Sequence, residues 1–270
     1  MFQEIMVIIN ALNVKIDLVN DRKDDIVFIS KILSKKTFQN NIQLAYDLFD
    51  TLCVSTNEKS LIIKNILLEL TDKETGYPNR EQVLLKVIEL AGDDDTSDSL
   101  YIKSKAYSWL KVKYNDLAIE YLRKYLNKGV SEYAINRTLG VKIPYSNKVF
   151  LHLSEVYCEL GDKLIISHEY ENALDAYNNM LKNDSMSKFR FGRQISYLKI
   201  ADTYRRMNDL DKAIFTLENA SYPNDCIDDD STISKNYIVN EFNSSISNAL
   251  NDYKIKKEQG YVFRPRKKKE

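Results

Sequence analysis

Residues 197–220 read Y-L-K-I-A-D-T-Y-R-R-M-N-D-L-D-K-A-I-F-T-L-E-N-A, and this stretch decides the fold. Two small side chains, Ala201 and Ala213, are twelve residues apart, and large apolar side chains surround both at helical spacing. Two antiparallel helices approach closely only where the side chains at their crossing are small. The stretch therefore predicts a helix–turn–helix hairpin in which the two alanines meet.

This pattern resembles the tetratricopeptide (TPR) repeat, a two-helix unit of about 34 residues. A weaker relative spans residues 100–126, where Ala106 and Ala118 repeat the twelve-residue spacing. Another begins near Lys148. Because the repeats are unequally spaced, the resemblance implies an irregular array of about three of them within residues 100–220.

The relative that begins near Lys148 matches less simply. We align Ser154 and Ala173 with the two small positions, although these residues are nineteen apart. The seven extra residues correspond to two helical turns, so both apolar faces keep their phase. The alignment predicts a protruding, partly apolar elbow at residues 164–166, and the alternative is that these side chains pack on residues 130–143.

The resemblance implies an all-α fold, a right-handed array of antiparallel helix hairpins. Residues 93–258 would form the repeats, with a helix from about residue 231 to residue 258 capping the exposed face of the last hairpin. Gly260 would end that helix, and residues 259–270 would form a basic tail. Seven glycines and four prolines are few for 270 residues, which favours helices over turn-rich β-structure.

The region 1–92 is expected to be helical, either as degenerate TPR-like hairpins or as a separate domain. Apolar residues recur there at helical spacing in four segments, residues 24–35, 38–53, 59–71 and 79–90. Alternation of apolar and charged residues near residues 14–18 leaves a short strand open. A further short helix is predicted at residues 131–139, in the connection between the first two repeats.

Composition argues against several function classes. Thirty-nine basic and thirty-nine acidic residues cancel, so no net charge steers the chain toward nucleic acid or a membrane. Three cysteines without a C-x-x-C pair predict neither a disulfide framework nor a zinc site, and they fit a cytoplasmic protein. No Gly-rich phosphate loop, G-x-S-x-G elbow or H-E-x-x-H motif is present. We therefore expect a non-enzymatic protein with no cofactor, no metal site and no membrane-spanning segment.

Aspartates at positions 93–98 have a calcium-like composition, but they lack the Gly and distal Glu of an EF-hand loop. They are better explained as capping the helix that contains Leu100, because carboxylates stabilise the positive end of a helix.

The remaining candidate for function is a surface. In TPR folds the first helix of each hairpin lines a concave groove that binds an extended peptide or a partner helix. Transferring that geometry gives candidate partner-binding positions on all three first helices: Lys103, Tyr107, Leu110, Lys111, Leu151, His152, Glu155, Glu159, Leu198, Lys199, Asp202, Arg205 and Arg206. Tyr107 and His152 stand where a chaperone-binding carboxylate clamp would need Asn, which argues against that activity.

An alternative function involves the basic tail. Arg264, Arg266, Lys267, Lys268 and Lys269 have the charge to neutralise several phosphates in a salt-sensitive, sequence-independent contact with nucleic acid. The repeats would then serve for dimerisation or recruitment, which makes a homo-oligomer a further expectation. The tail is otherwise a solvated end, or one that folds back on acidic loops such as residues 225–230.

Overall fold

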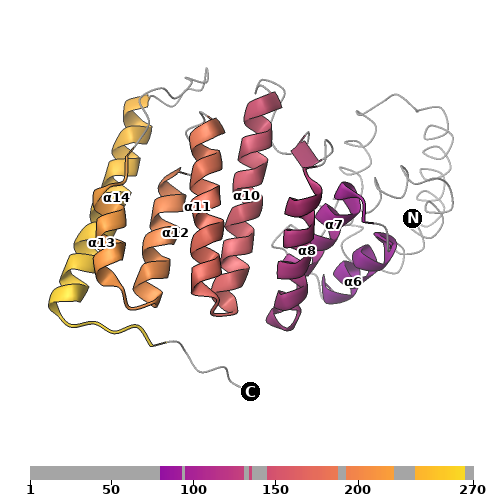
Figure 1. Ribbon diagram of the computed structural model, residues 1–270, viewed down its shortest axis with the longest axis horizontal. Coiled ribbons are helices and arrows are strands. Elements are labelled where there is room, and N and C mark those ends of the chain that lie inside the picture. The colour runs from indigo at the N-terminus through magenta and orange to yellow at the C-terminus, as the bar shows by residue number, and fades with distance from the viewer. Residues whose placement is uncertain are drawn as a thin grey trace, which may run out of the picture. The chain divides into compact units, whose positions relative to one another are not determined.

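The computed structural model describes residues 80–92, 95–130, 134–135, 145–187, 193–221 and 235–264. All regular structure in these ranges is helical, and they contain no strand (Figure 1). The predicted all-α fold of packed helices is thus confirmed. The chain divides into two compact units, residues 1–111 and 112–270, which are described separately.

The described part of the first unit is a pair of packed helices, α6 (Arg80–Leu90) and α7 (Ser97–Trp109). Helix α6 confirms the helix predicted at residues 79–90. Thr96 is the N-cap of α7, accepting a hydrogen bond from the Ser99 N–H at 3.2 Å, and Asp98 lies in the first turn. The helices and strand predicted upstream of residue 72 lie outside the described residues.

The second unit is a succession of helices in which each described helix packs on the next described helix along the chain (Figure 1). The helix that follows α8 in this order is α10. Their bounds are η1 (Val112–Tyr114), α8 (Asn115–Lys128), α10 (Tyr145–Ile166), α11 (Tyr170–Ser187), α12 (Arg193–Arg206), α13 (Leu210–Glu218) and α14 (Lys235–Glu258). Of the short helix predicted at residues 131–139, residues 134–135 are described, and both are helical.

The hairpin of α12 and α13 confirms the prediction from residues 197–220. Ala201 and Ala213 are both fully buried. Between the helices Asn208 adopts the left-handed conformation with φ 63°, and Asp209 caps α13 by accepting the Lys212 N–H at 3.0 Å. Asn and Asp tolerate these two positions well, because their short polar side chains bond to nearby backbone.

Helix α14 covers this last hairpin, which confirms the predicted capping role. Its side chains Phe242, Ile246 and Tyr253 belong to one core cluster with Ala201 and Leu217. Burying these large side chains removes the apolar edge that a terminal hairpin would otherwise expose to water.

The alignment of the middle hairpin was wrong by seven residues. Gly161 and Ala173 are twelve residues apart, and the turn after α10 has the geometry of the turn after α12. His168 has φ 62°, as Asn208 has 63°, and the Glu169 N–H bonds to the Leu164 carbonyl at 2.9 Å. Seven residues leave the helical phase almost unchanged, so periodicity alone did not separate the two alignments.

Close approach of α10 and α11 occurs at Gly161, which faces the Tyr177 ring. A Cβ atom at position 161 would lie 2.3 Å from Tyr177 Cε1, so any larger residue there requires the ring or the helices to shift. Ser154 is instead two turns away and donates a hydrogen bond to Asp184. Where the elbow was predicted, α10 continues to Ile166, and the Leu164 side chain is 1% exposed whereas that of Ile166 is 39% exposed. The stretch is therefore the end of a helix and not a protruding turn. Packing of residues 164–166 on residues 130–143 stays a prediction, because most of the latter lie outside the described residues.

The remaining repeat crosses the boundary between the two units. Ala106 on α7 and Ala118 on α8 are each fully buried, as their spacing suggests. Their mutual contact stays a prediction.

Candidate interaction surface

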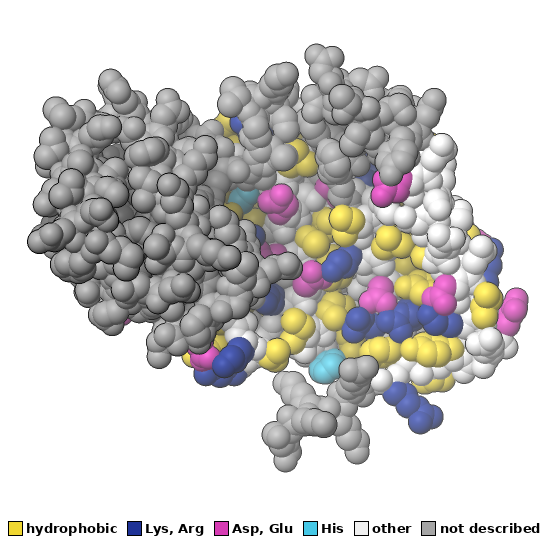
Figure 2. Space-filling model, turned by 180° about the vertical axis from the view of Figure 1, so that it is seen from behind, with side chains coloured by type: hydrophobic (Ala, Val, Ile, Leu, Met, Phe, Trp, Pro, Cys, Tyr) yellow, Lys and Arg dark blue, Asp and Glu magenta, His cyan; other side chains and the backbone are white. Residues whose placement is uncertain are grey.

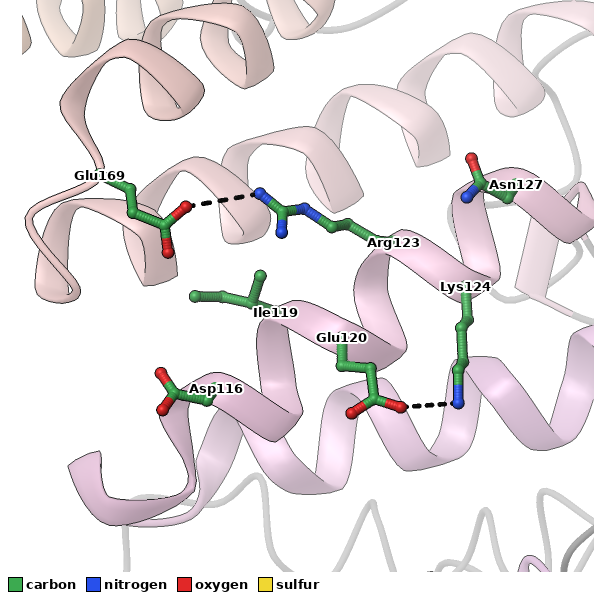
Figure 3. Close-up of a pocket in the computed structure, with 7 residues that line it drawn as sticks. All are labelled: Asp116, Ile119, Glu120, Arg123, Lys124, Asn127 and Glu169. Atoms are coloured by element: carbon green, nitrogen blue, oxygen red, sulfur yellow. Dashed lines mark ion pairs between the residues drawn. The ribbon is translucent and has the colours of Figure 1, made fainter.

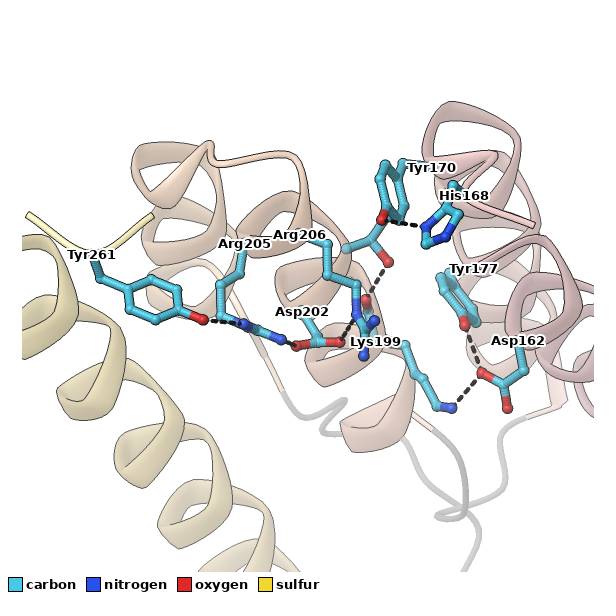
Figure 4. A network of polar contacts seen from close by, with 10 residues as sticks. Asp162, His168, Tyr170, Tyr177, Lys199, Asp202, Arg205, Arg206 and Tyr261 are labelled. Atoms are coloured by element: carbon cyan, nitrogen blue, oxygen red, sulfur yellow. Dashed lines mark hydrogen bonds and ion pairs between the residues drawn. The ribbon is translucent and has the colours of Figure 1, made fainter. Parts of the chain in front are cut away.

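Two aspartates occupy equivalent positions on the first helices of successive hairpins. Asp162 follows Gly161 on α10, and Asp202 follows Ala201 on α12. Each is the centre of a polar cluster, and the Asp202 cluster extends through Arg205 to Tyr261 in the chain that follows α14 (Figure 4). Figure 2, seen from behind, shows a row of cationic side chains bordered by acidic and hydrophobic ones.

The Asp162 cluster joins three helices. The Tyr177 hydroxyl of α11 donates to Asp162 Oδ1 at 2.6 Å, and Lys199 of α12 forms an ion pair with the same oxygen. Lys199 Nζ also lies 5.8 Å from the centroid of the Tyr177 ring. Burial, and then the Asp162 charge, raises the pKa of Tyr177, so its hydroxyl stays a hydrogen-bond donor at neutral pH.

The Asp202 cluster holds two arginines in place. Arg205 donates through Nε and Nη2 to Asp202 Oδ1 at 2.8 and 2.6 Å, and Arg206 Nε donates to Oδ2 at 2.7 Å. Burial alone would raise the pKa of Asp202, but the hydrogen bonds from Arg206 and Arg205 outweigh it and lower that pKa. Asp202 is therefore ionised at neutral pH, and the guanidinium planes are fixed before anything binds to them.

The chain reverses after α14 and returns to these arginines. Gly260 adopts φ 64°, and the Tyr261 N–H bonds to the Lys256 carbonyl at 2.9 Å, which ends the helix in the usual glycine-terminated way. The Tyr261 hydroxyl then accepts a hydrogen bond from Arg205 Nη1 at 3.1 Å (Figure 4).

Phe263 makes the other contacts of this segment. Its N–H donates to Asn208 Oδ1 at 2.5 Å, and the Asn208 amide nitrogen lies 3.5 Å from its carbonyl oxygen. The guanidinium carbons of Arg205 and Arg206 lie 5.1 and 5.5 Å from the centroid of its ring, within cation–π range. Residues 261–263 thus lie against the end of α12 and the turn before α13.

A third polar cluster, around Asp184, is buried between α10, α11 and α12. Asp184 accepts hydrogen bonds from Ser154 and, at 2.6 Å, from Ser196. Burial raises the pKa of Asp184, although these two hydroxyls and the charge of Arg193 lower it in part. The cluster is closed off from solvent, so we assign it to holding the three helices together.

Four of the candidate residues from sequence are buried, which contradicts their expected accessibility. Lys103 and Leu110 are 4% and 8% exposed, in the first unit. Leu151 and His152 lie in the part of α10 that precedes the crossing at Gly161, and His152 Nε2 is 2.8 Å from the Tyr125 hydroxyl of α8. These two positions were assigned through the wrong alignment, and they pack on a neighbouring helix instead.

The other candidates are at least partly exposed. Lys111 pairs with Glu81 at 2.8 Å in the first unit, where Tyr107 is half-buried. Glu155 is exposed and Glu159 half-buried on α10, and Leu198 packs beside the core of the last hairpin. The Asp162 and Asp202 clusters contain the last four candidate residues, Lys199, Asp202, Arg205 and Arg206.

Of the tail residues proposed for nucleic acid, Arg264 is exposed. Arg266, Lys267, Lys268 and Lys269 lie outside the described residues, as do the acidic residues 225–230.

Sequence reasoning missed five members of this surface, namely Asp162, Tyr177, Asn208, Tyr261 and Phe263. A search for the twelve-residue spacing would have aligned Gly161 with Ala201 and so revealed Asp162 beside it. The contacts of Tyr261 and Phe263 have no comparable signal, because they depend on where the chain turns after Gly260.

A separate open pocket of about 360 Å³ lies along α8 (Figure 3). Four of its charged side chains pair with one another, Arg123 with Glu169 at 3.6 Å and Lys124 with Glu120 at 2.6 Å. Asp116 also lines the pocket, so its lining carries more acidic than basic side chains. None of the described helices is long and apolar enough to cross a membrane.

No protein-family model and no curated protein matches the chain. Among solved structures, the chain is similar to one described as MamA, with 18% identity and a TM-score of 0.35 over 68% of this chain and 90% of that one. It is also similar to BtubC (BKLC) from P. vanneervenii, with 14% identity and a TM-score of 0.47 over 87% and 98% of the two chains.

Proposed function

We propose that the chain is a non-enzymatic, TPR-like adaptor or regulatory protein that binds a peptide or protein partner on the face carrying Asp162 and Asp202. One observation carries this proposal: the α12 end of this face already holds a peptide segment, residues 261–263 of the same chain. The side chains of this face bond to the backbone and the tyrosine hydroxyl of the tail segment and contact its aromatic ring. The same side chains can bind a partner segment that offers the same groups.

The order of these side chains supports a binding role. The Arg205 side chain is 14% exposed and is fixed by two hydrogen bonds to Asp202. A side chain that is already ordered loses little rotamer entropy when a partner binds, and this favours affinity.

The chemistry of the face supports binding over catalysis. Burial, and then the nearby Asp162 charge, raises the pKa of Cys158 to about 11. At neutral pH this thiol is protonated, whereas the thiolate is the nucleophilic form. The carboxylates Asp162 and Asp202 are both paired with cationic side chains, an arrangement that orders a surface and leaves neither as a ready proton acceptor.

Affinity capture from lysate of the native organism, with mass spectrometry, tests the proposal. The bait is the full chain as wild type, as Lys199→Glu, or as Lys124→Glu. Both variants reverse a lysine that pairs with a carboxylate, Asp162 for Lys199 and Glu120 for Lys124, but on different surfaces. We expect wild type and Lys124→Glu to retain the same protein partner, and Lys199→Glu to lose it.

Two controls make the result decisive. Unfolding curves of both variants exclude loss of the fold, and nuclease treatment of the lysate separates a protein partner from one held through nucleic acid. Loss of all capture after nuclease treatment would favour the basic-tail alternative. Equal capture by all three baits would place the interaction away from this face and overturn the proposal.

A further inference from the structure

The contacts of residues 261–263 define a binding site more narrowly than the face as a whole. We propose that the end of α12 and the turn before α13 bind an extended segment of the type Tyr-x-Phe, and that the chain's own Tyr261–Phe263 occupies this site. A partner segment of the same chemistry would compete with the tail. This inference rests on the proposed function and names the partner chemistry for it.

The site contacts three features of the segment bound to it. Arg205 donates to the tyrosine hydroxyl, Arg205 and Arg206 lie over the phenylalanine ring, and Asn208 accepts the phenylalanine N–H. The middle residue, Val262, is 58% exposed, and alternate side chains of an extended segment point to opposite sides. The site therefore selects two aromatic residues separated by one residue of any kind.

The protein side of the site is also held by contacts that do not involve the tail. Asp202 orients both guanidinium groups, and the Asp209 N–H bonds to the Tyr204 carbonyl at 2.9 Å to close the turn that holds Asn208. The equivalent turn of the previous hairpin has the same backbone but carries His168, whose Nδ1 bonds to the Tyr170 hydroxyl at 2.9 Å. Its side chain is already engaged, so the two turns differ in what they offer to a peptide.

The tail is held in a way that permits exchange. Tyr261 remains 38% exposed, and its contacts are a few hydrogen bonds and cation–π interactions at the surface. A short tether gives the tail a local concentration in the millimolar range. For a free peptide with a Kd of about 100 µM, a local tail concentration of about 1–10 mM would weaken apparent binding about 10- to 100-fold.

The test uses a fluorescent peptide with the sequence of residues 259–266, Gln-Gly-Tyr-Val-Phe-Arg-Pro-Arg. It is titrated against the full chain as wild type and as Tyr261→Ala/Phe263→Ala, which empties the site without shortening the chain. We expect the emptied chain to bind at least about tenfold more tightly than wild type, because the tail no longer competes. A scrambled peptide of the same composition controls for attraction by charge alone.

A matched pair of glycine variants locates the site. Asn208→Gly in the emptied chain keeps the left-handed backbone but removes the carboxamide, and we expect about fivefold weaker binding for the loss of one hydrogen bond. His168→Gly makes the same change in the other turn and should leave binding unchanged. Equal effects of the two variants, equal binding of the scrambled peptide, or no tighter binding by the emptied chain would overturn the inference.

These outcomes are separate from those of the capture experiment. If the peptide fails to bind while Lys199→Glu still loses its protein partner, the face binds partners of another chemistry. In that case the Tyr-x-Phe inference fails and the proposed function stands.

Discussion

Replacing Gly161 with alanine tests the corrected alignment of the middle hairpin. The new Cβ atom would lie 2.3 Å from Tyr177 Cε1, whereas an ordinary contact is 3.4–4 Å, so a shift of more than 1 Å is required. The Tyr177 ring has little room to give way, because it is 1% exposed and its hydroxyl bonds to Asp162. The added methyl group must therefore force the two helices apart or displace the ring.

The expected magnitude is the difference between two effects. Overpacking a core costs about 1–3 kcal/mol, whereas glycine to alanine within a helix stabilises by roughly 0.5–1 kcal/mol. We expect Gly161→Ala to lower the free energy of unfolding by about 1–2 kcal/mol, a fall in Tm of about 2–8 °C. Urea and thermal unfolding followed by circular dichroism measure both quantities.

A second background shows whether the Tyr177 ring is the cause. In Tyr177→Ala the ring is absent, and Gly161→Ala should then be neutral or stabilising, which gives a coupling energy of about 1 kcal/mol or more between the two positions. If Gly161→Ala stabilises the protein equally in both backgrounds, Gly161 is not the crossing point and the alignment is refuted.

Three further predictions concern other parts of the second unit, and urea unfolding measures each of them. Burial raises the pKa of Asp184 above its ordinary value of 3.8. As pH rises from 3.8 through that raised pKa, wild type should therefore lose stability relative to Asp184→Asn. A difference in unfolding free energy between the two proteins that does not change with pH would contradict this. His168 has φ 62°, a conformation that a β-branched residue adopts poorly, so His168→Val should cost about 1–3 kcal/mol. His168→Gly should change stability by less than about 0.5 kcal/mol. Equal effects of the two substitutions would argue against the left-handed turn. Phe242→Ala should cost about 3–5 kcal/mol because its side chain is 3% exposed beneath the capping helix, whereas the exposed neighbour Asn243→Ala should change stability by less than about 0.5 kcal/mol.

The sequence predicted the parts of the fold that depend on local periodicity. Ala201 and Ala213 mark the last hairpin correctly, because small residues at a fixed separation reflect a close helix crossing. The same reasoning misplaced the middle hairpin at Ser154, since a shift of two full turns preserves the apolar faces. The helices α10 and α11 cross at Gly161. The feature of the sequence that indicated this crossing was the twelve-residue spacing between Gly161 and Ala173.

The candidate site was less predictable because it depends on contacts between distant residues. Arg205 and Arg206 both pair with Asp202, because residues three and four positions apart share one face of a helix. Their contacts with Phe263 arise from a chain reversal at Gly260, more than fifty residues later. Lys103 was expected to line the groove because of its position on the first helix of a TPR-like repeat. Its side chain is buried, because burial depends on how neighbouring helices pack, which periodicity does not encode.

The most direct measurement of the central claim is hydrogen exchange of the Phe263 amide, followed by NMR on the full chain. In the structure this N–H donates to Asn208 Oδ1 at 2.5 Å. If the surface holds the tail as we propose, exchange in wild type should be at least about tenfold slower than in Asn208→Gly, and His168→Gly should match wild type. Exchange at the same unprotected rate in wild type and Asn208→Gly would show that the segment is not bound there, and would contradict the account.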